Sequence, residues 1–195
     1  MCKTNQVASM KDIEYATAAD FCTIFDKDMN SLYLLSLLLA GDRQKAEQCF
    51  VEGLENATSR NRVFKEWARS WARRAIIQNV LRIVNPRPDG GDWSWDSATM
   101  NRGGEVLSEP AEITAVLGLR PFDRFVFVMS VLEGYSDHDC AILLGCARRD
   151  VLVAKTRALQ QIGSAAELRL KQEANINSEE LLAHQSPSSV AEGAA

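Results

Sequence analysis

The sequence lacks long apolar runs, has only two histidines and has no paired pattern of cysteines, and these absences exclude several classes of protein. The longest apolar run, residues 32–40, is far shorter than the roughly 20 residues that span a bilayer, so we expect no membrane insertion. Residues 1–20 show no charged start followed by an apolar run, which a secretory signal requires. Five scattered cysteines, an odd number, fit reduced thiols in a cytoplasmic protein better than a disulfide framework.

The residue groupings that support catalysis or metal binding are also missing. There is no phosphate-binding glycine loop, no serine–histidine–acid grouping and no pair of carboxylates on a rigid frame, so we expect no enzyme. His138, Cys140 and Cys146 lie close together, but a structural zinc site needs four ligands and no fourth is near. We therefore expect no metal and no other cofactor. A redox role is not favoured either, because helical spacing puts Cys140 on a buried face, where thiols are usually inert.

The chain has no net positive charge, since its formal charge is −4 at pH 7. A generic nucleic-acid coat would be basic overall, so any nucleic-acid contact must come from local basic faces. Residues 60–84 predict one such face on a helix, because they contain a single acid, Glu66, against seven basic residues: Arg60, Arg62, Lys65, Arg69, Arg73, Arg74 and Arg82. Trp67 and Trp71 recur at helical spacing in the same stretch. The alternative interpretation is a solvated helix face whose tryptophans belong to the core.

Apolar residues recur at helical spacing along most of the chain and predict an all-α protein. The prolines and glycines of residues 85–92 cannot continue a helix, so they mark a linker between two small helical domains. The polar ends of the chain are expected to be disordered. The predicted segments are an arm (1–17), a first domain (18–84), a flexible linker (85–105) containing the possible docking residues Trp93 and Trp95, a second domain (106–171) and a tail (172–195).

Residues 134–158 predict two helices joined by a tight turn. Ser136 is a suitable N-cap for the first helix, and Gly145 supplies the positive φ that ends it. The second helix is expected from about Ala147, with a buried face at three-and-four spacing: Val151, Ala154, Ala158 and Ile162. The cations left for a partner are Arg148, Arg149, Lys155 and Arg157. A helix-turn-helix offers its second helix to the DNA major groove in this way, whereas the alternative is a structural hairpin with solvated cations.

Longer motifs point to a family. Residues 119–128 form a leucine–proline, acid–arginine, aliphatic run, and residues 133–136 form a glutamate–glycine–aromatic–serine turn. Together with Ala141, Leu144-Gly145-Cys146, Val151 and Arg157-Ala158, they resemble region 4 of the sigma-70 family of RNA polymerase sigma factors. Residues 39–47 and 64–82 resemble its region 2 more loosely. The chain is most similar to the small extracytoplasmic-function (ECF) type, which keeps only regions 2 and 4.

This resemblance implies a function in transcription. Region 2 would dock on the clamp helices of core RNA polymerase, with Glu47, Phe50 and Leu54 as candidate contacts. Its last helix would face the promoter minus-10 element, with Lys65, Trp67, Arg69, Arg73 and Arg74 as candidate DNA contacts. Region 4 would bring Arg148, Arg149, Lys155 and Arg157 to the minus-35 element. The implied partners are core RNA polymerase and promoter DNA, with an anti-sigma factor as a further candidate.

Several positions depart from the family pattern and keep other functions open. Gln48 and Val51 stand where the resemblance leads us to expect an acid and a glutamine for the polymerase contact, and Arg74 and Gln78 replace the usual asparagine and aspartate of the promoter helix. Leu152 and Ala154 fall where basic residues are common, and Ala147 replaces the usual serine cap. The first alternative is therefore a sigma-like protein-interaction module that has lost promoter recognition. A DNA-binding repressor is less favoured, because no dimer element is evident.

Overall fold

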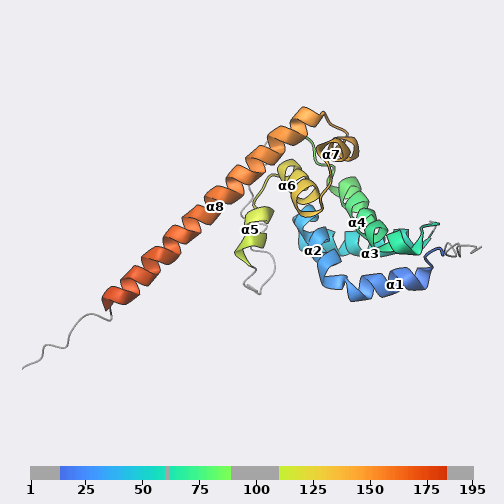
Figure 1. Ribbon diagram of the computed structural model, residues 1–195, viewed down its shortest axis with the longest axis horizontal. Coiled ribbons are helices and arrows are strands. Elements are labelled where there is room, and N and C mark those ends of the chain that lie inside the picture. The colour runs from blue at the N-terminus through green and yellow to red at the C-terminus, as the bar shows by residue number, and fades with distance from the viewer. Residues whose placement is uncertain (1–13, 60–61, 89–109, 184–195) are drawn as a thin grey trace, which may run out of the picture.

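The computed structural model describes residues 14–59, 62–88 and 110–183 and consists mainly of helices (Figure 1). An isolated bridge between Tyr15 and Phe64 joins two extended segments. The elements are, in chain order, α1 (Ala18–Lys27), α2 (Met29–Ala40), α3 (Arg43–Ser59), the 3-10 turn η1 (Lys65–Trp67), α4 (Ala68–Val84), α5 (Ala111–Leu117), α6 (Pro121–Phe127), the π-helical turn η2 (Val128–Leu132), α7 (Asp137–Leu144) and α8 (Arg148–Ala183). The predicted all-α class is confirmed for this part of the chain.

Helices α1 to α4 form the first group, in which α3 and α4 pack against each other and against α2. The close approach of α3 to α4 depends on Gly53, where a Cβ atom would come within 2.9 Å of Ile76 Cγ1. Helix α2 is buried from Leu35 to Ala40 on all sides, as expected of a helix that is apolar all round. It ends at Gly41, whose φ of 73° gives a left-handed C-cap.

The sequence pattern predicts one helix from Ala18 to the Gly41-Asp42 stop, but the structure divides it at Asp28. Asp28 leaves helical geometry, with φ −102° and ψ 15°, and links α1 to α2. Aspartate is a poor residue for a helix interior because its short polar side chain competes with the backbone. After α2, the predicted cap of the next helix is confirmed, since Asp42 Oδ1 accepts a hydrogen bond of 2.9 Å from the Lys45 amide.

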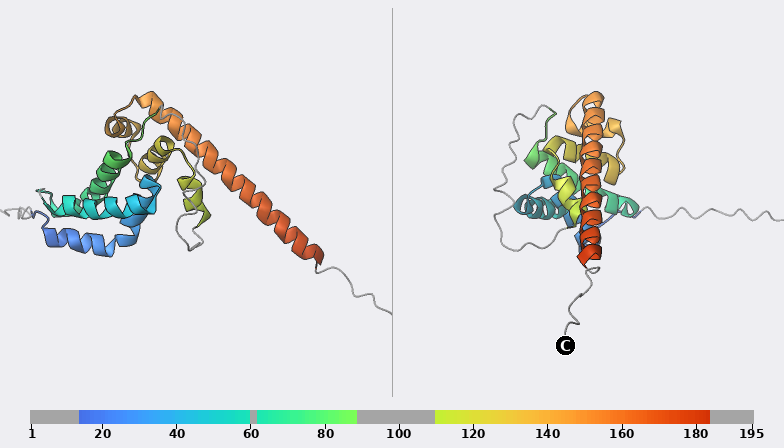
Figure 2. Two further views of the ribbon diagram at one scale, coloured as in Figure 1. Left: turned by 180° about the vertical axis from the view of Figure 1, so that it is seen from behind. Right: turned by 90° about the vertical axis from the view of Figure 1, so that its left-hand side faces the viewer.

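Helices α5 to α8 form the second group around α6, which is buried from Phe122 to Phe127. Helix α8 packs on α6 through Val151, Ala154 and Ala158, which are fully buried at the predicted spacing. The C-terminal part of α8 projects away from the other helices (Figures 1 and 2). The predicted tail from Gln172 differs from the structure, because α8 continues to Ala183; residues 184–195 lie outside the described residues.

The two groups of helices contact each other, and their buried residues form one contiguous cluster. Helix α2 contacts α5, α6 and η2. The centre of this junction is Arg124, which is 4% exposed and donates hydrogen bonds of 3.3 Å to four carbonyls: those of Leu39, Ala40, Leu117 and Leu119. Burial lowers the pKa of Arg124 to about 10, so the guanidinium is still cationic at pH 7. Most of the predicted linker, with Trp93 and Trp95, lies outside the described residues.

Candidate nucleic-acid interface

The helical hairpin α7–α8 has the local geometry that its sequence predicts. Ser136 caps α7, since its hydroxyl oxygen accepts a hydrogen bond of 3.1 Å from the Asp139 amide. Gly145 ends α7 with a φ of 62°. Asp150 then caps the start of α8, because its Oδ2 accepts a hydrogen bond of 3.2 Å from the Ala147 amide. With one face of α8 buried on α6, its opposite face is left exposed from the first turn onward.

The four cations predicted on α8 fall into two classes. Lys155 donates to Asp137 Oδ1 at 3.2 Å, and Arg157 donates to Asp123 Oδ1 at 2.8 Å. Asp123 is buried and also binds Arg120, so the Arg157 contact is part of a three-residue ion-pair group. Arg148 and Arg149 are exposed, and neither has an ion pair within residues 14–59, 62–88 and 110–183.

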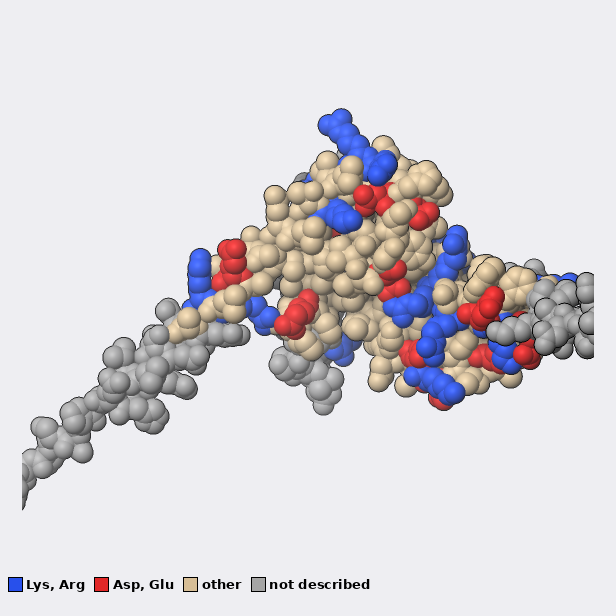
Figure 3. All heavy atoms as spheres, in the orientation of Figure 1, with Lys and Arg blue, Asp and Glu red and all other residues tan. Residues whose placement is uncertain are grey.

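Basic side chains gather in two places on the face shown in Figure 3, one at the start of α8 and one over α1 and α4, where acidic side chains lie between them. Over α1 and α4, Arg69 Nε lies 2.8 Å from Asp28 Oδ2. Arg73 forms a two-pronged ion pair with Glu133 and also donates to Ser31 Oγ at 3.0 Å. The hydrogen bonds that Arg73 donates to the Glu133 carboxylate raise the pKa of Arg73 above its ordinary value.

Arg74, one residue further on, is exposed and has no ion pair in the described part of the chain. Glu133 belongs to the turn before α7, so the Arg73–Glu133 pair ties α4 to the second group of helices. The pair lines an open polar pocket of about 510 Å³ between α4 and the turn before α7, together with Ser70, Tyr135 and Asp139.

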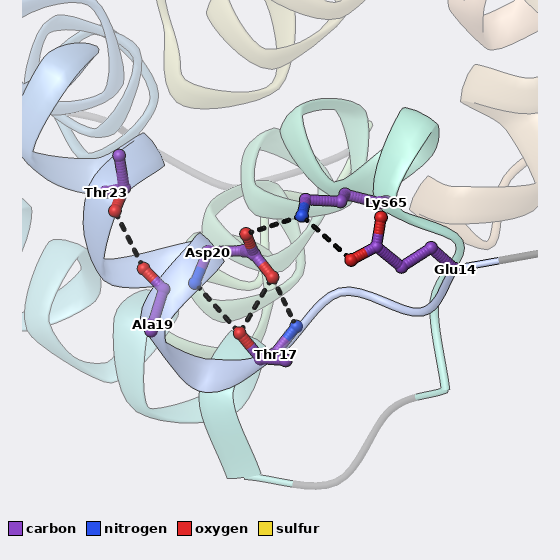
Figure 4. Close-up of polar contacts among 6 residues, drawn as sticks. All are labelled: Glu14, Thr17, Ala19, Asp20, Thr23 and Lys65. Atoms are coloured by element: carbon purple, nitrogen blue, oxygen red, sulfur yellow. Dashed lines mark hydrogen bonds and ion pairs between the residues drawn. The ribbon is translucent and has the colours of Figure 1, made fainter.

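Lys65 is held by acids at the start of the first group (Figure 4). Its Nζ lies 3.2 Å from Glu14 Oε1 and 3.4 Å from Asp20 Oδ1, and the hydrogen bond to Glu14 raises its pKa. Asp20 also completes the capping box of α1, where the Thr17 amide donates to it at 2.8 Å. That backbone hydrogen bond is the main reason that the pKa of Asp20 is lowered.

An aromatic cluster lies beside these cations. Trp67 is 58% exposed and packs edge-on against Phe64, with ring centroids 5.2 Å apart. Phe64 stacks on Tyr15 at 5.1 Å, and the Arg62 guanidinium lies 5.8 Å from the centre of the Tyr15 ring. The interpretation of the tryptophans as core residues therefore fails for Trp67, whereas Trp71 is partly buried against the core.

The three residues predicted to contact polymerase have different surroundings. Glu47 is exposed on the outer face of α3, one turn before Val51, which is 54% exposed. Phe50 is half-buried and packs edge-on against Phe25, with centroids 5.4 Å apart, while Leu54 packs partly into the same core. The outer face of α3 therefore offers Glu47 and Val51 to a partner.

Sequence reasoning missed the acids that hold the predicted cations. Asp28, Asp123 and Glu133 each lie more than 30 residues from the predicted DNA-contact arginine that they bind, so spacing gives no signal for these pairs. Arg124 differs from these acids, because the sequence alone indicates its role. An arginine inside the apolar run of α6 must be buried, and a buried charge needs hydrogen-bond partners.

Within the described residues, none of the helices combines the length and apolar content that crossing a bilayer requires. No protein-family model matches the sequence, and no curated protein matches it.

Proposed function

We propose that this chain is a sigma-type factor that binds core RNA polymerase and directs it to promoter DNA. The observation that carries the proposal is the pair of unneutralised arginines, Arg148 and Arg149, in the first turn of α8. Cations at a helix N-terminus oppose the helix dipole and destabilise the helix by about 0.3–1 kcal/mol each. Helix stability therefore does not explain them, whereas a phosphate or guanine edge in a major groove does.

The α4 surface supports the second half of the proposal. Exposed aromatic rings beside arginines suit unpaired bases, which stack on aromatic faces while cations bind the phosphates. Trp67 and Arg74 are exposed there, and Arg69 and Arg73 would join them by exchanging their carboxylate partners for phosphates. Such a surface fits melted promoter DNA, as the sequence resemblance implies.

A second candidate function is a protein-interaction module that no longer recognises promoters. It is favoured by the ion pairs that already engage Lys155 and Arg157 on α8, and by the apolar side chains of Leu152 and Val153 on the exposed face of the same helix. A helix that carries fewer available cations and more exposed apolar surface is a better protein-binding surface than one built for phosphates.

The test is transcription of a genomic promoter library by purified core polymerase, with and without the full chain. Protein-dependent transcripts that share upstream motifs are expected. The double variant Arg148→Ala/Arg149→Ala should lose most of these transcripts, and the salt slope of promoter binding should become shallower by about 2, close to 0.9 for each lost phosphate contact. The matched control is Arg169→Ala, which removes an exposed arginine from the projecting part of α8.

Three outcomes separate the two functions. Transcripts that depend on the arginines of the first turn support a sigma factor. Binding to core polymerase without any transcript favours the interaction module. Transcripts that survive the double variant unchanged refute the role that we give to Arg148 and Arg149.

A further inference from the structure

The outer face of α8 begins with an arginine and continues with methyl groups. Arg149, Leu152, Val153 and Thr156 are spaced at i, i+3, i+4 and i+7, so they share one face of the helix. Leu152 is 47% exposed and Val153 is 46% exposed, although both are apolar. Thr156 donates its hydroxyl to the Leu152 carbonyl at 3.0 Å, which leaves the methyl group as the free end of its side chain.

Arg148 borders this face at its start, one turn before Leu152, but the cations further along the segment turn away from it. Lys155 and Arg157 are drawn toward Asp137 and Asp123, which belong to α7 and α6. Beyond Arg149 the face is therefore apolar for about two turns. Leu159, at i+7 from Leu152 and 48% exposed, extends the same face. A protein partner is still a weaker explanation, because three half-exposed side chains form a far smaller apolar patch than a stable protein interface buries, and the patch begins with Arg148 and Arg149.

The apolar feature that a major groove offers to an α-helix is the C5 methyl group of thymine. We infer that Leu152, Val153 and Thr156 read thymine methyl groups in the upstream element of the promoter, beside a guanine or phosphate bound by Arg149. This inference rests on the proposed function and specifies which bases the α8 surface selects.

The helix geometry gives the expected layout of the site. A rise of about 1.5 Å per residue puts Leu152 and Val153 roughly 5 Å along the helix from Arg149, and Thr156 roughly 10 Å along it. With base pairs about 3.4 Å apart, the thymines should follow the Arg149 contact within about one to three base pairs.

Uracil tests the inference without altering the protein, because it lacks only the methyl group of thymine. Promoters recovered by the transcription assay are resynthesised with uracil in place of thymine in the upstream element alone. Transcription and binding are then measured with core polymerase and the full chain. Burying one methyl-sized group changes affinity about fourfold, so each contacted thymine should lose about that factor on replacement.

Protein variants assign the effect to α8. Leu152→Ala should weaken binding to the thymine template and bring the ratio between thymine and uracil templates closer to one. Val153→Ala should do the same. The control is Leu168→Ala, because Leu168 is 63% exposed on the same helix and lies about 24 Å further along it, so both templates should be unaffected.

Each other outcome counts against the inference. Equal activity on thymine and uracil templates refutes methyl readout, and so does the recovery of upstream elements that contain no thymine. Both results still support the sigma function. An unchanged uracil effect in both variants refutes the assignment to Leu152 and Val153. Weaker binding of Leu152→Ala to core polymerase itself identifies this face as a protein contact and overturns the inference. If no promoter is recovered at all, both the inference and the proposed function fail.

Discussion

The contact between Gly41 and Arg124 allows a quantitative test of how the two groups of helices are joined. Gly41 has a φ of 73°, and a Cβ atom added there would overlap the Arg124 guanidinium. Gly145 has a similar φ of 62°, but its added Cβ would meet nothing within 4 Å. The two glycines therefore separate the cost of a left-handed backbone from the cost of displacing Arg124.

The expected magnitudes follow from this difference. Gly145→Ala should destabilise the protein by about 1 kcal/mol, the cost of placing an L-residue in the left-handed region. Gly41→Ala should destabilise the protein by about 2 kcal/mol more than Gly145→Ala, because Nη2 of Arg124 loses its two hydrogen bonds to the Leu39 and Ala40 carbonyls. These hydrogen bonds are long, at 3.3 Å, so each contributes about 1 kcal/mol. In an Arg124→Ala background, that second cost should disappear.

The assay is urea unfolding followed by far-ultraviolet circular dichroism, with each glycine variant made in both backgrounds. We expect a coupling free energy of about 2 kcal/mol between Gly41 and Arg124, and none between Gly145 and Arg124, since distant sites add within about 0.5 kcal/mol. If Gly41→Ala costs no more than Gly145→Ala, or costs the same with and without Arg124, the guanidinium does not hold the junction in the way we describe.

Three further predictions concern the cap of α7, the buried thiols and the ion pair between the groups. Ser136→Ala should lower the free energy of unfolding by about 1 kcal/mol in the same urea assay, because it removes an N-cap, whereas Ser164→Ala should have little effect. Burial raises the pKa of the Cys140 thiol to about 11, so about one thiol in a thousand is ionised at pH 8; an iodoacetamide pulse read by mass spectrometry should label exposed Cys22 and spare Cys140. Glu133→Gln should release its arginine and strengthen binding to labelled single-stranded DNA in an anisotropy titration, with a salt slope steeper by about 0.7.

Each of these expectations has a result that would contradict it. Equal losses of stability in Ser136→Ala and Ser164→Ala would show that the Ser136 cap does not stabilise α7. Equal labelling of Cys22 and Cys140 would show that the core around α7 opens readily. The labelling of Cys140 should rise with pH up to about 11, because the thiolate reacts and the pKa is raised. For Glu133→Gln the control is Glu112→Gln, since the Glu112 side chain on α5 is 84% exposed and its ion pair with Arg169 is a weak one of 4.0 Å; equal gains in the two variants would reflect net charge rather than the release of Arg73.

Local geometry is the part of the structure that could be predicted from the sequence. Gly41 and Gly145 end helices because they reach positive φ without a steric penalty, and Ser136 and Asp42 cap helices because their side chains reach amides two or three residues on. These effects act within one turn of a helix. The buried face of α8 was equally predictable, since three-and-four spacing of apolar residues has one solution on a helix.

Apolar spacing alone does not predict the length of α8, which continues to Ala183 beyond its packed face. From residue 163 to 183 the sequence is rich in alanine, leucine and glutamate, which favour helix even without a packed face. The spacing of apolar residues also does not predict the break between α1 and α2 at Asp28, where the sequence has neither proline nor glycine. In both places the local propensity of the residues, rather than burial, decided the outcome.

The candidate site shows why counting cations on a helix overestimates the charge that the helix can offer. Of the eight predicted DNA-contact cations, five are ion-paired to acids: Lys65, Arg69, Arg73, Lys155 and Arg157. These acids come from other elements of the fold, so only tertiary structure reveals them. The affinity of the free chain for DNA should accordingly depend most on Arg148, Arg149 and Arg74, which have no ion pair with any residue that the structure describes.

This sorting of charges also links DNA binding to the arrangement of the helices. Using Arg73 on a phosphate means giving up Glu133, which holds α4 against the turn before α7. A phosphate that replaces Glu133 therefore weakens one contact between the two groups, while Arg124 still joins α2 to α6. Binding at α4 should then be more favourable when the groups are already apart, so a variant that loosens the Arg124 junction should bind single-stranded DNA more tightly even though it is less stable. Tighter binding by Arg124→Ala that disappears when Arg73 is also removed would demonstrate this coupling, and unchanged binding would refute it.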